Sequence, residues 1–165
     1  MNGLVKVLVD AFGGLGKEVV VFIISMMPLL ELRGGLLAAA LLKMDFVPAY
    51  LISIVGNTLP IPLVLLFLDK VFNFLKKSKK LNKLISKLEN KILSKKGQIE
   101  KYGYLGLLLF VGIPLPGTGA WTGAGLAVLL NLNKKKAFVS IMLGVILASI
   151  IMSILSYGIL DKIIH

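Results

Sequence analysis

Apolar residues in this chain form runs of two lengths, and a helix needs about 20 of them to cross a bilayer. Two runs reach that length, residues 46–68 (FVPAYLISIVGNTLPIPLVLLFL) and residues 137–160 (AFVSIMLGVILASIIMSILSYGIL). We expect each run to be a transmembrane helix. The stretch GNTLPIP in the first is expected to kink the helix or to unwind a turn that faces a cavity.

Four other apolar runs are too short to span a bilayer, and they stand in two neighbouring pairs. They are residues 19–30, 34–42, 104–116 and 124–132. We predict two re-entrant hairpins, at residues 18–44 and 103–132, that enter the membrane and leave it on the same side. The alternative is one long helix through each pair, which interior prolines such as Pro28 disfavour.

Residues 71–101, between these segments, are rich in lysine and have apolar residues at helical spacing. Those apolar residues are Leu81, Leu84, Ile85, Leu88 and Ile92. The pattern predicts a basic amphipathic helix that lies on the membrane surface and links the two halves, with a partner-binding helix as the alternative. Residues 1–16 are expected to form a short interfacial helix, which the glycines after Phe12 end.

The two halves of the chain match when Arg33 is aligned with Trp121 without a gap. The alignment pairs Gly35 with Gly123, Ala49 with Ala137 and Gly56 with Gly144. We expect one all-α membrane domain over residues 1–165, with repeat 1 at residues 17–70 and repeat 2 at residues 102–162. Each repeat would be a hairpin followed by a transmembrane helix. If the basic linker is cytoplasmic, the two repeats are inverted, as in many transporters.

Composition supports a membrane protein. The hydrophobic fraction is 57% and the mean hydropathy is +0.91, whereas soluble domains are about 45 to 50% apolar. The net charge of +11 could indicate nucleic-acid binding, but the lysines cluster in residues 76–101 and 134–136, beside apolar segments. Such clusters are typical of cytoplasmic anchors that face anionic lipid, so we expect no nucleic-acid partner. The absence of cysteine excludes disulfides and thiolate chemistry.

The first hairpin has two ionisable residues, Glu31 and Arg33, in the stretch MMPLLELRGG. Ionisable side chains at membrane depth are costly and usually face a cavity and a partner. In the functional interpretation, Glu31 exchanges a proton as the site opens to either side, and Arg33 holds Glu31 or binds a phosphate or carboxylate. In the structural interpretation the two side chains pair with each other, or Arg33 reaches the interface and fixes the tip.

The second hairpin has an uncharged tip, GIPLPGTGAWTGAG, which offers hydroxyls, an indole and freed backbone groups. Its tryptophan fits an interfacial anchor and an aromatic surface for a cation equally well. The candidate substrate- or ion-binding residues are Glu31, Arg33, Asn57, Thr118, Trp121 and Thr122. The residues expected at the hairpin tips are Pro28, Gly34, Gly35, Pro114, Pro116, Gly117, Gly119 and Gly123.

Together, PLLELRGG and IPLPGTGAWTGA resemble the small multidrug export protein family of bacteria and archaea. That family is similar in its hairpins to the broader DedA, VTT or SNARE-associated membrane proteins, which are linked to proton-dependent drug tolerance and to the movement of lipid phosphates. The resemblance implies a transport protein of the prokaryotic inner or plasma membrane. Two features depart from the pattern: LLAAA follows ELRGG where many relatives have proline, and the arginines of the DedA second hairpin are absent.

We therefore expect a secondary transporter, with proton-coupled export of small molecules and a site between the hairpins. The alternative is a lipid scramblase or a translocase of lipid-carrier phosphate, in which Arg33 meets the headgroup. An intramembrane enzyme is not expected, because the sequence has no catalytic motif and its one histidine is His165. We expect no cofactor or metal, and we expect membrane lipids as partners and a homodimer or larger oligomer that shields the hairpins from lipid.

Overall fold

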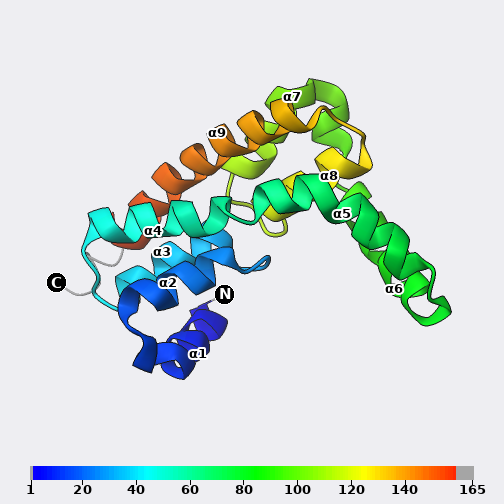
Figure 1. Cartoon of the computed structure of the whole chain (residues 1–165). Helices are drawn as coiled ribbons and strands as arrows, with labels where there is room; N and C mark the ends of the chain where they lie inside the picture. Colours follow the sequence, from blue (N-terminus) through cyan, green and yellow to red (C-terminus); the bar gives the residue numbers. More distant parts are fainter. Residues whose placement is uncertain (1, 159–165) are drawn as a thin grey trace.

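The computed structural model describes residues 2–158, which form an all-helical fold without a β-strand in that range (Figure 1). The expected all-α class is confirmed. Residue 1 of the predicted interfacial helix and residues 159–162 of predicted repeat 2 lie outside the described residues. The helices are α1 (Asn2–Phe12), α2 (Lys17–Met26), α3 (Glu31–Leu41), α4 (Phe46–Thr58), α5 (Ile61–Lys76), α6 (Lys79–Leu93), α7 (Gly97–Gly112), α8 (Ala120–Leu129) and α9 (Lys134–Ser153), with a 3-10 turn at Gly13–Leu15 and a π-helical turn at Ile154–Gly158.

Two helical segments of the described chain are long and apolar enough to cross a membrane. These are Phe46–Lys76 and Lys134–Tyr157, in which a stretch of 18 residues has a mean hydropathy of 2.2 and of 2.7, respectively. The first segment consists of α4 and α5, which follow each other almost end to end in Figure 1 and meet at Leu59 and Pro60. Pro60 has no backbone N–H to donate, so the ladder of helical hydrogen bonds is interrupted there, as the GNTLPIP stretch predicts.

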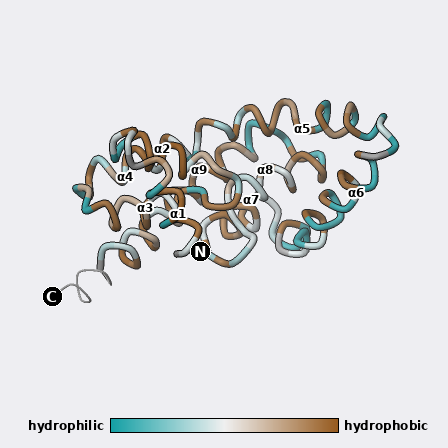
Figure 2. Tube along the Cα trace, turned by 90° about the horizontal axis from the view of Figure 1, so that it is seen from below, coloured by the Kyte–Doolittle hydropathy of each residue, from teal (hydrophilic) through white to brown (hydrophobic). Residues whose placement is uncertain are grey.

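Both segments expose a stripe of apolar side chains at helical spacing, each between 43% and 66% accessible. The stripe on α4 and α5 consists of Leu51, Val55, Leu59, Leu63 and Leu66, and the stripe on α9 of Val139, Leu143, Ile146, Ile150 and Ile154. Contiguous apolar surface of this extent is rare on monomeric soluble proteins, whereas lipid covers it in a membrane. The stripes and the hydropathy together indicate a membrane protein. In Figure 2, α4, α5 and α9 are largely apolar, and hydrophilic colour is concentrated on α6.

Helix α3 lies between two hydrophobic clusters and joins the two halves of the chain. Leu30, at its start, and Ala38 pack in a cluster with residues of α1, α2 and α4. Leu32 and Leu36 pack in the other cluster with residues of α5, α7, α8 and α9. Because the two clusters share this helix, a shift of α3 would be felt in both halves.

Two glycines let α4 and α9 approach another helix of their own half closely. An added Cβ at Gly56 of α4 would lie 2.8 Å from the carbonyl oxygen of Phe22 in α2. An added Cβ at Gly144 of α9 would lie 2.7 Å from the carbonyl oxygen of Leu108 in α7. Real Cβ atoms do not come so close to backbone, so both positions require glycine.

Helices α3 and α8 end in the same way, in the register that aligns Arg33 with Trp121. Their last residues are Leu41 and Leu129, and two residues later Lys43 and Asn131 have φ angles of 49° and 53°. After α3, the N–H groups of Leu42, Lys43 and Met44 donate to the carbonyls of Ala38, Ala40 and Ala39, respectively. After α8, the N–H groups of Leu130, Asn131 and Leu132 donate to the carbonyls at the matching positions, Leu126, Val128 and Ala127. The following helices, α4 and α9, also begin at matched positions.

Helix α6 lies within the predicted basic linker and packs against α5 and α8. Its Ile85 is buried, and its Glu89 forms a salt bridge of 2.6 Å with Lys76 at the end of α5. Helices α5 and α6 project together from the rest of the molecule in Figure 1. The lysine-rich segment is therefore fixed beside α5 and α8 rather than separated from them.

Candidate functional site

The turn between α2 and α3 brings Glu31 to the meeting point of the two halves. The backbone N–H groups of Leu30 and Glu31 both donate to the carbonyl of Met27. Glu31 is the first residue of α3, has a φ of 52° and is only 6% exposed. A left-handed backbone is uncommon for a residue with a side chain, so the contacts that Glu31 makes must offset its cost.

The carboxylate of Glu31 accepts hydrogen bonds from the first two backbone N–H groups of α8. Oε2 lies 3.0 Å from the nitrogen of Ala120, and Oε1 lies 3.0 Å from the nitrogen of Trp121. Helix α8 has no side-chain cap of its own, because its N-cap residue is Gly119. Glu31 therefore caps α8 from the other half of the chain, with a negative charge at the positive end of the helix dipole.

Gly119 is the residue that makes room for this carboxylate. Its φ of 142° and ψ of −176° lie in a region that essentially only glycine occupies. An added Cβ would lie 2.6 Å from Cδ and 2.7 Å from Oε1 of Glu31, and closer still to Oε2. Both the backbone conformation and the space at this position therefore require glycine.

Arg33, two residues after Glu31, binds the loop that joins α7 to α8, at the end nearer α7. Its Nη1 donates to the carbonyl oxygen of Leu115 at 2.7 Å, and its Nη2 donates to Oγ1 of Thr118 at 3.0 Å. A longer contact of 3.4 Å joins Nη2 to the carbonyl oxygen of Ile113, which is the C-cap residue of α7. The Thr118 hydroxyl lies 2.8 Å from the Leu115 carbonyl oxygen, so it can accept from Arg33 and donate to this carbonyl.

The two charges of the first tip thus complement the two helix ends of the second. The carboxylate of Glu31 lies at the start of α8, and the guanidinium of Arg33 lies at the carbonyls that follow the end of α7. One alternative from the sequence is that Glu31 and Arg33 pair with each other. No salt bridge joins the two side chains in the described residues 2–158, so this pairing is not observed. We call these contacts the tip clamp. Hydrogen bonds to charged groups contribute about 1.5 to 3 kcal/mol each, which makes the clamp the strongest polar link between the halves.

The remaining predicted tip residues divide between turns and helices. Pro28 lies in the turn before α3, and Pro114, Pro116, Gly117 and Gly119 lie in the loop between α7 and α8. Gly34, Gly35 and Gly123 lie within helices, at close contacts with neighbouring side chains. Thus the loop supplies the groups that Arg33 binds, and the helical glycines bring α3 and α8 close to the helices beside them.

A cavity of about 390 Å³ opens beside the tip clamp. Its wall contains Pro28 from the turn before α3, Trp121 and Thr122 from α8, Lys91 from α6 and Lys95 from the turn after α6. The indole N–H of Trp121 is buried and has no hydrogen-bond partner among the described residues. Apolar side chains of α5 and α6 complete the wall, so a molecule bound there would meet an apolar surface with positive charge at one side.

Asn57, also predicted as a site residue, is in a different place. It is 2% exposed in α4, and no hydrogen bond joins it to either tip in the described part of the chain. Its Oδ1, the hydroxyl of Thr58 and the hydroxyl of Ser53 are buried without partners there. These three polar groups lie just before the proline break between α4 and α5.

The sequence predicted freed backbone groups at the second tip, but not which ones they are. They are the backbone N–H groups of Ala120 and Trp121 and the carbonyls of Ile113 and Leu115. The lysines at positions 91 and 95 were not predicted as site residues. One feature of the sequence indicated the N–H groups of Ala120 and Trp121. Helix α8 begins after glycine rather than after a residue with a capping side chain, so its first N–H groups need an acceptor from elsewhere.

Comparison with known proteins gives one family. Residues 31–151 match the family described as "Putative small multi-drug export protein". No curated protein and no solved structure matches the chain. The matched range begins at Glu31 and includes both helices capped by the tip clamp, most of the cavity wall and most of both candidate spans. Since the match covers most of the chain, this protein belongs to the small multi-drug export protein family.

Proposed function

We propose that this protein is a secondary transporter that exports small molecules, with its site at the tip clamp and the adjoining cavity. The observation that most supports this is that one buried carboxylate holds the start of α8 across the boundary between the two halves. Transporters commonly place their sites where broken helices of two halves meet. The family description, small multi-drug export, agrees with this function.

We further propose that α2 with α3, and α7 with α8, are re-entrant hairpins of an inverted repeat. An α-helix of about 10 residues is about 15 Å long, half of the hydrocarbon thickness, so α2, α3 and α8 are too short to cross alone. The matched ends of α3 and α8, and the matched contacts of Gly56 and Gly144, support the repeat. The lysine-rich α6 would face the cytoplasm of a prokaryotic cell, which inverts the second half relative to the first.

In the proposed mechanism, Glu31 couples transport to protons. The ionised carboxylate accepts two N–H groups, one on each oxygen. A proton on one oxygen removes the negative charge and makes that oxygen a hydroxyl, which is a weaker acceptor, so its contact with the N–H group is weakened. The weakened clamp would let α8 move and open the cavity to the other side. Release of the proton there would restore both contacts and close the tips.

A second candidate is the movement of lipid or lipid-carrier phosphate. It is favoured by Lys91 and Lys95, which place two positive charges at an otherwise apolar cavity. No acidic side chain is in that wall as far as the chain is described, so an amphiphile with an anionic headgroup fits it better than a cation. In either function, a homodimer would cover part of the exposed apolar surface of the hairpins.

Reconstituted liposomes can distinguish the two functions. One arm measures efflux of a fluorescent cation, ethidium, and of a fluorescent sulfonate, anilinonaphthalene sulfonate, under an imposed pH gradient. The other arm measures flip of a fluorescent phospholipid without a gradient. For a proton-coupled exporter, we expect gradient-driven efflux that Glu31→Gln abolishes while the fold is retained. Gradient-independent flip that Arg33→Ala abolishes would establish lipid movement instead, and protein without activity in either arm would contradict both.

A further inference from the structure

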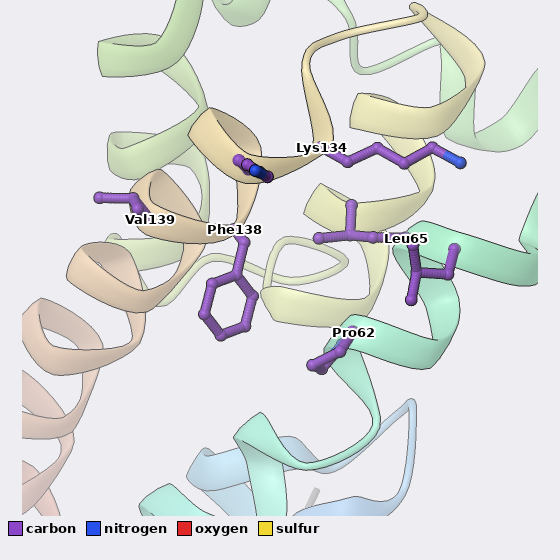
Figure 3. Close-up of a pocket in the computed structure, with 7 residues that line it drawn as sticks. Pro62, Leu65, Lys134, Phe138 and Val139 are labelled. Carbon is purple, nitrogen blue, oxygen red and sulfur yellow. The ribbon is translucent and has the colours of Figure 1, made fainter.

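A second cavity, separate from the tip clamp, lies between α5 and α9 and has a volume of about 360 Å³. Figure 3 shows Pro62 and Leu65 of α5 on one wall, Phe138 and Val139 of α9 on the other, and Lys134 at the end where α9 begins. We call it the α5/α9 groove. None of its residues belongs to the wall of the cavity at the tips.

The groove opens toward the surface that we assign to lipid. Leu66 and Val139, at its edges, are 51% and 57% exposed, and they belong to the apolar stripes of the two spans. The wall is almost wholly apolar, because the two lysines line it with their methylene stems and their ammonium groups add little to it. Acyl chains are therefore the molecules that such a groove meets in a membrane.

The charge at the end of the groove selects the headgroup. Lys134 and Lys135 both line the groove, and its wall contains no acidic side chain within the described residues. The second and third N–H groups of α9 are already occupied, because Oδ1 of Asn133 accepts from the nitrogens of Lys135 and Lys136 at 3.1 Å. The ammonium groups, rather than the helix end, are therefore what a phosphate would bind.

We propose that the α5/α9 groove binds an anionic phospholipid, with an acyl chain between the two helices and the phosphate at Lys134 and Lys135. Basic pockets between membrane helices bind anionic headgroups in this way. The site does not depend on the proposed transport function. The bound lipid would fix the start of α9 at the level of the headgroups. Helix α9 also packs along α7.

The third lysine of the run provides a charge-matched control. The Nζ of Lys136 lies 6.0 Å from the centre of the Tyr104 ring on α7, and Lys136 does not line the groove. Replacing any one of the three lysines by glutamine removes the same charge from the same turn of helix. Only two of the three replacements should therefore affect a lipid bound in the groove.

Native mass spectrometry of the detergent-solubilised protein tests the proposal, with phosphatidylglycerol and phosphatidylcholine of equal chain length as probes. We expect wild type to retain phosphatidylglycerol in preference to phosphatidylcholine. Lys134→Gln and Lys135→Gln should each weaken phosphatidylglycerol binding about fivefold, and the double variant about 30-fold, as expected for about 1 kcal/mol per lysine. Lys136→Gln should change it by less than about twofold. Equal effects of all three replacements, or no effect of the double variant, would overturn the proposal.

A second pair of variants tests the position of the acyl chain. Val139→Trp would fill the groove, whereas Ile150→Trp changes an equally exposed residue of α9 that does not line it. We expect Val139→Trp to lower retention of both lipids at least fivefold and Ile150→Trp to leave it unchanged. Because both side chains are at least half exposed, neither change should unfold the protein, which thermal unfolding in the same detergent checks. Equal lipid retention by the two variants would place the lipid outside the groove.

Discussion

Replacement of Gly119 by alanine should break the tip clamp without altering either of its charges. The new Cβ would overlap the carboxylate of Glu31, which must move away and lose its contacts with the N–H groups of Ala120 and Trp121. Alanine also strains the backbone at this φ and ψ. The substitution therefore combines backbone strain with the loss of the Glu31 contacts. Replacement of a second glycine, Gly103, measures the strain separately.

The expected magnitude follows from these two costs. The backbone strain is about 1 to 3 kcal/mol, and each buried N–H group left without an acceptor costs about 1 to 3 kcal/mol more. With two such N–H groups, Gly119→Ala should therefore lower the free energy of unfolding by roughly 3 to 9 kcal/mol. Gly103 has a φ of 58°, and an added Cβ there would meet no atom within 4 Å. Gly103→Ala should thus show the strain alone, about 1 to 3 kcal/mol.

The unfolding free energies can be measured by titration with SDS in mixed micelles. The single tryptophan, Trp121, is the second residue of α8, so its fluorescence reports on the clamp directly. In a Glu31→Ala background, which already lacks the carboxylate, Gly119→Ala should cost no more than Gly103→Ala, because coupled sites are not additive. If Gly119→Ala costs the same with and without Glu31, or no more than Gly103→Ala in wild type, the carboxylate does not cap α8.

Three further substitutions test neighbouring contacts. Thr118→Val should cost about 1 to 3 kcal/mol of unfolding free energy, because Arg33 loses an acceptor, whereas Thr118→Ser should cost less than about 1 kcal/mol; equal costs would contradict the role of the hydroxyl. Gly35→Ala should cost about 1 to 3 kcal/mol in an SDS titration, since its Cβ would overlap the Ser25 hydroxyl, and Ser25→Ala in the same chain should restore part of it. Trp121→Phe should change thermal stability by less than about 1 kcal/mol, because the indole N–H has no partner in the described structure; a fall in liposome efflux at unchanged stability would assign that N–H to the substrate.

The positions of the helix breaks could be predicted from local sequence, because prolines and glycines act on their own turn. Pro28 and the Pro114 to Gly119 loop separate short helices, and Pro60 interrupts the first span, as expected. The extent of the first span was predicted less well. Its apolar run ends at Leu68, but the helix continues to Lys76, since backbone hydrogen bonds persist after the side chains become polar.

The need of Glu31 and Arg33 for polar partners could also be predicted, because ionisable side chains among apolar ones are costly without them. The identity of their partners could not. They are mainly backbone groups more than 80 positions away, on a loop of uncharged residues, and no side-chain pattern encodes them. The pairing depends on how α3 packs between the two hydrophobic clusters, which is a property of the assembled chain.

The cap that Glu31 supplies to α8 has a consequence for how the chain is assembled during synthesis. Glu31 and Arg33 leave the ribosome well before the loop and helix that contain their partners. Until that later segment is inserted, the first half has two ionised groups without protein contacts, and they would have to stay near water or headgroups. The proposed hairpin of α2 and α3 could then reach its final position only when α8 arrives. Complete insertion of the N-terminal half would therefore depend on synthesis of the C-terminal half. A stop of translation before α8 would leave an incompletely inserted protein.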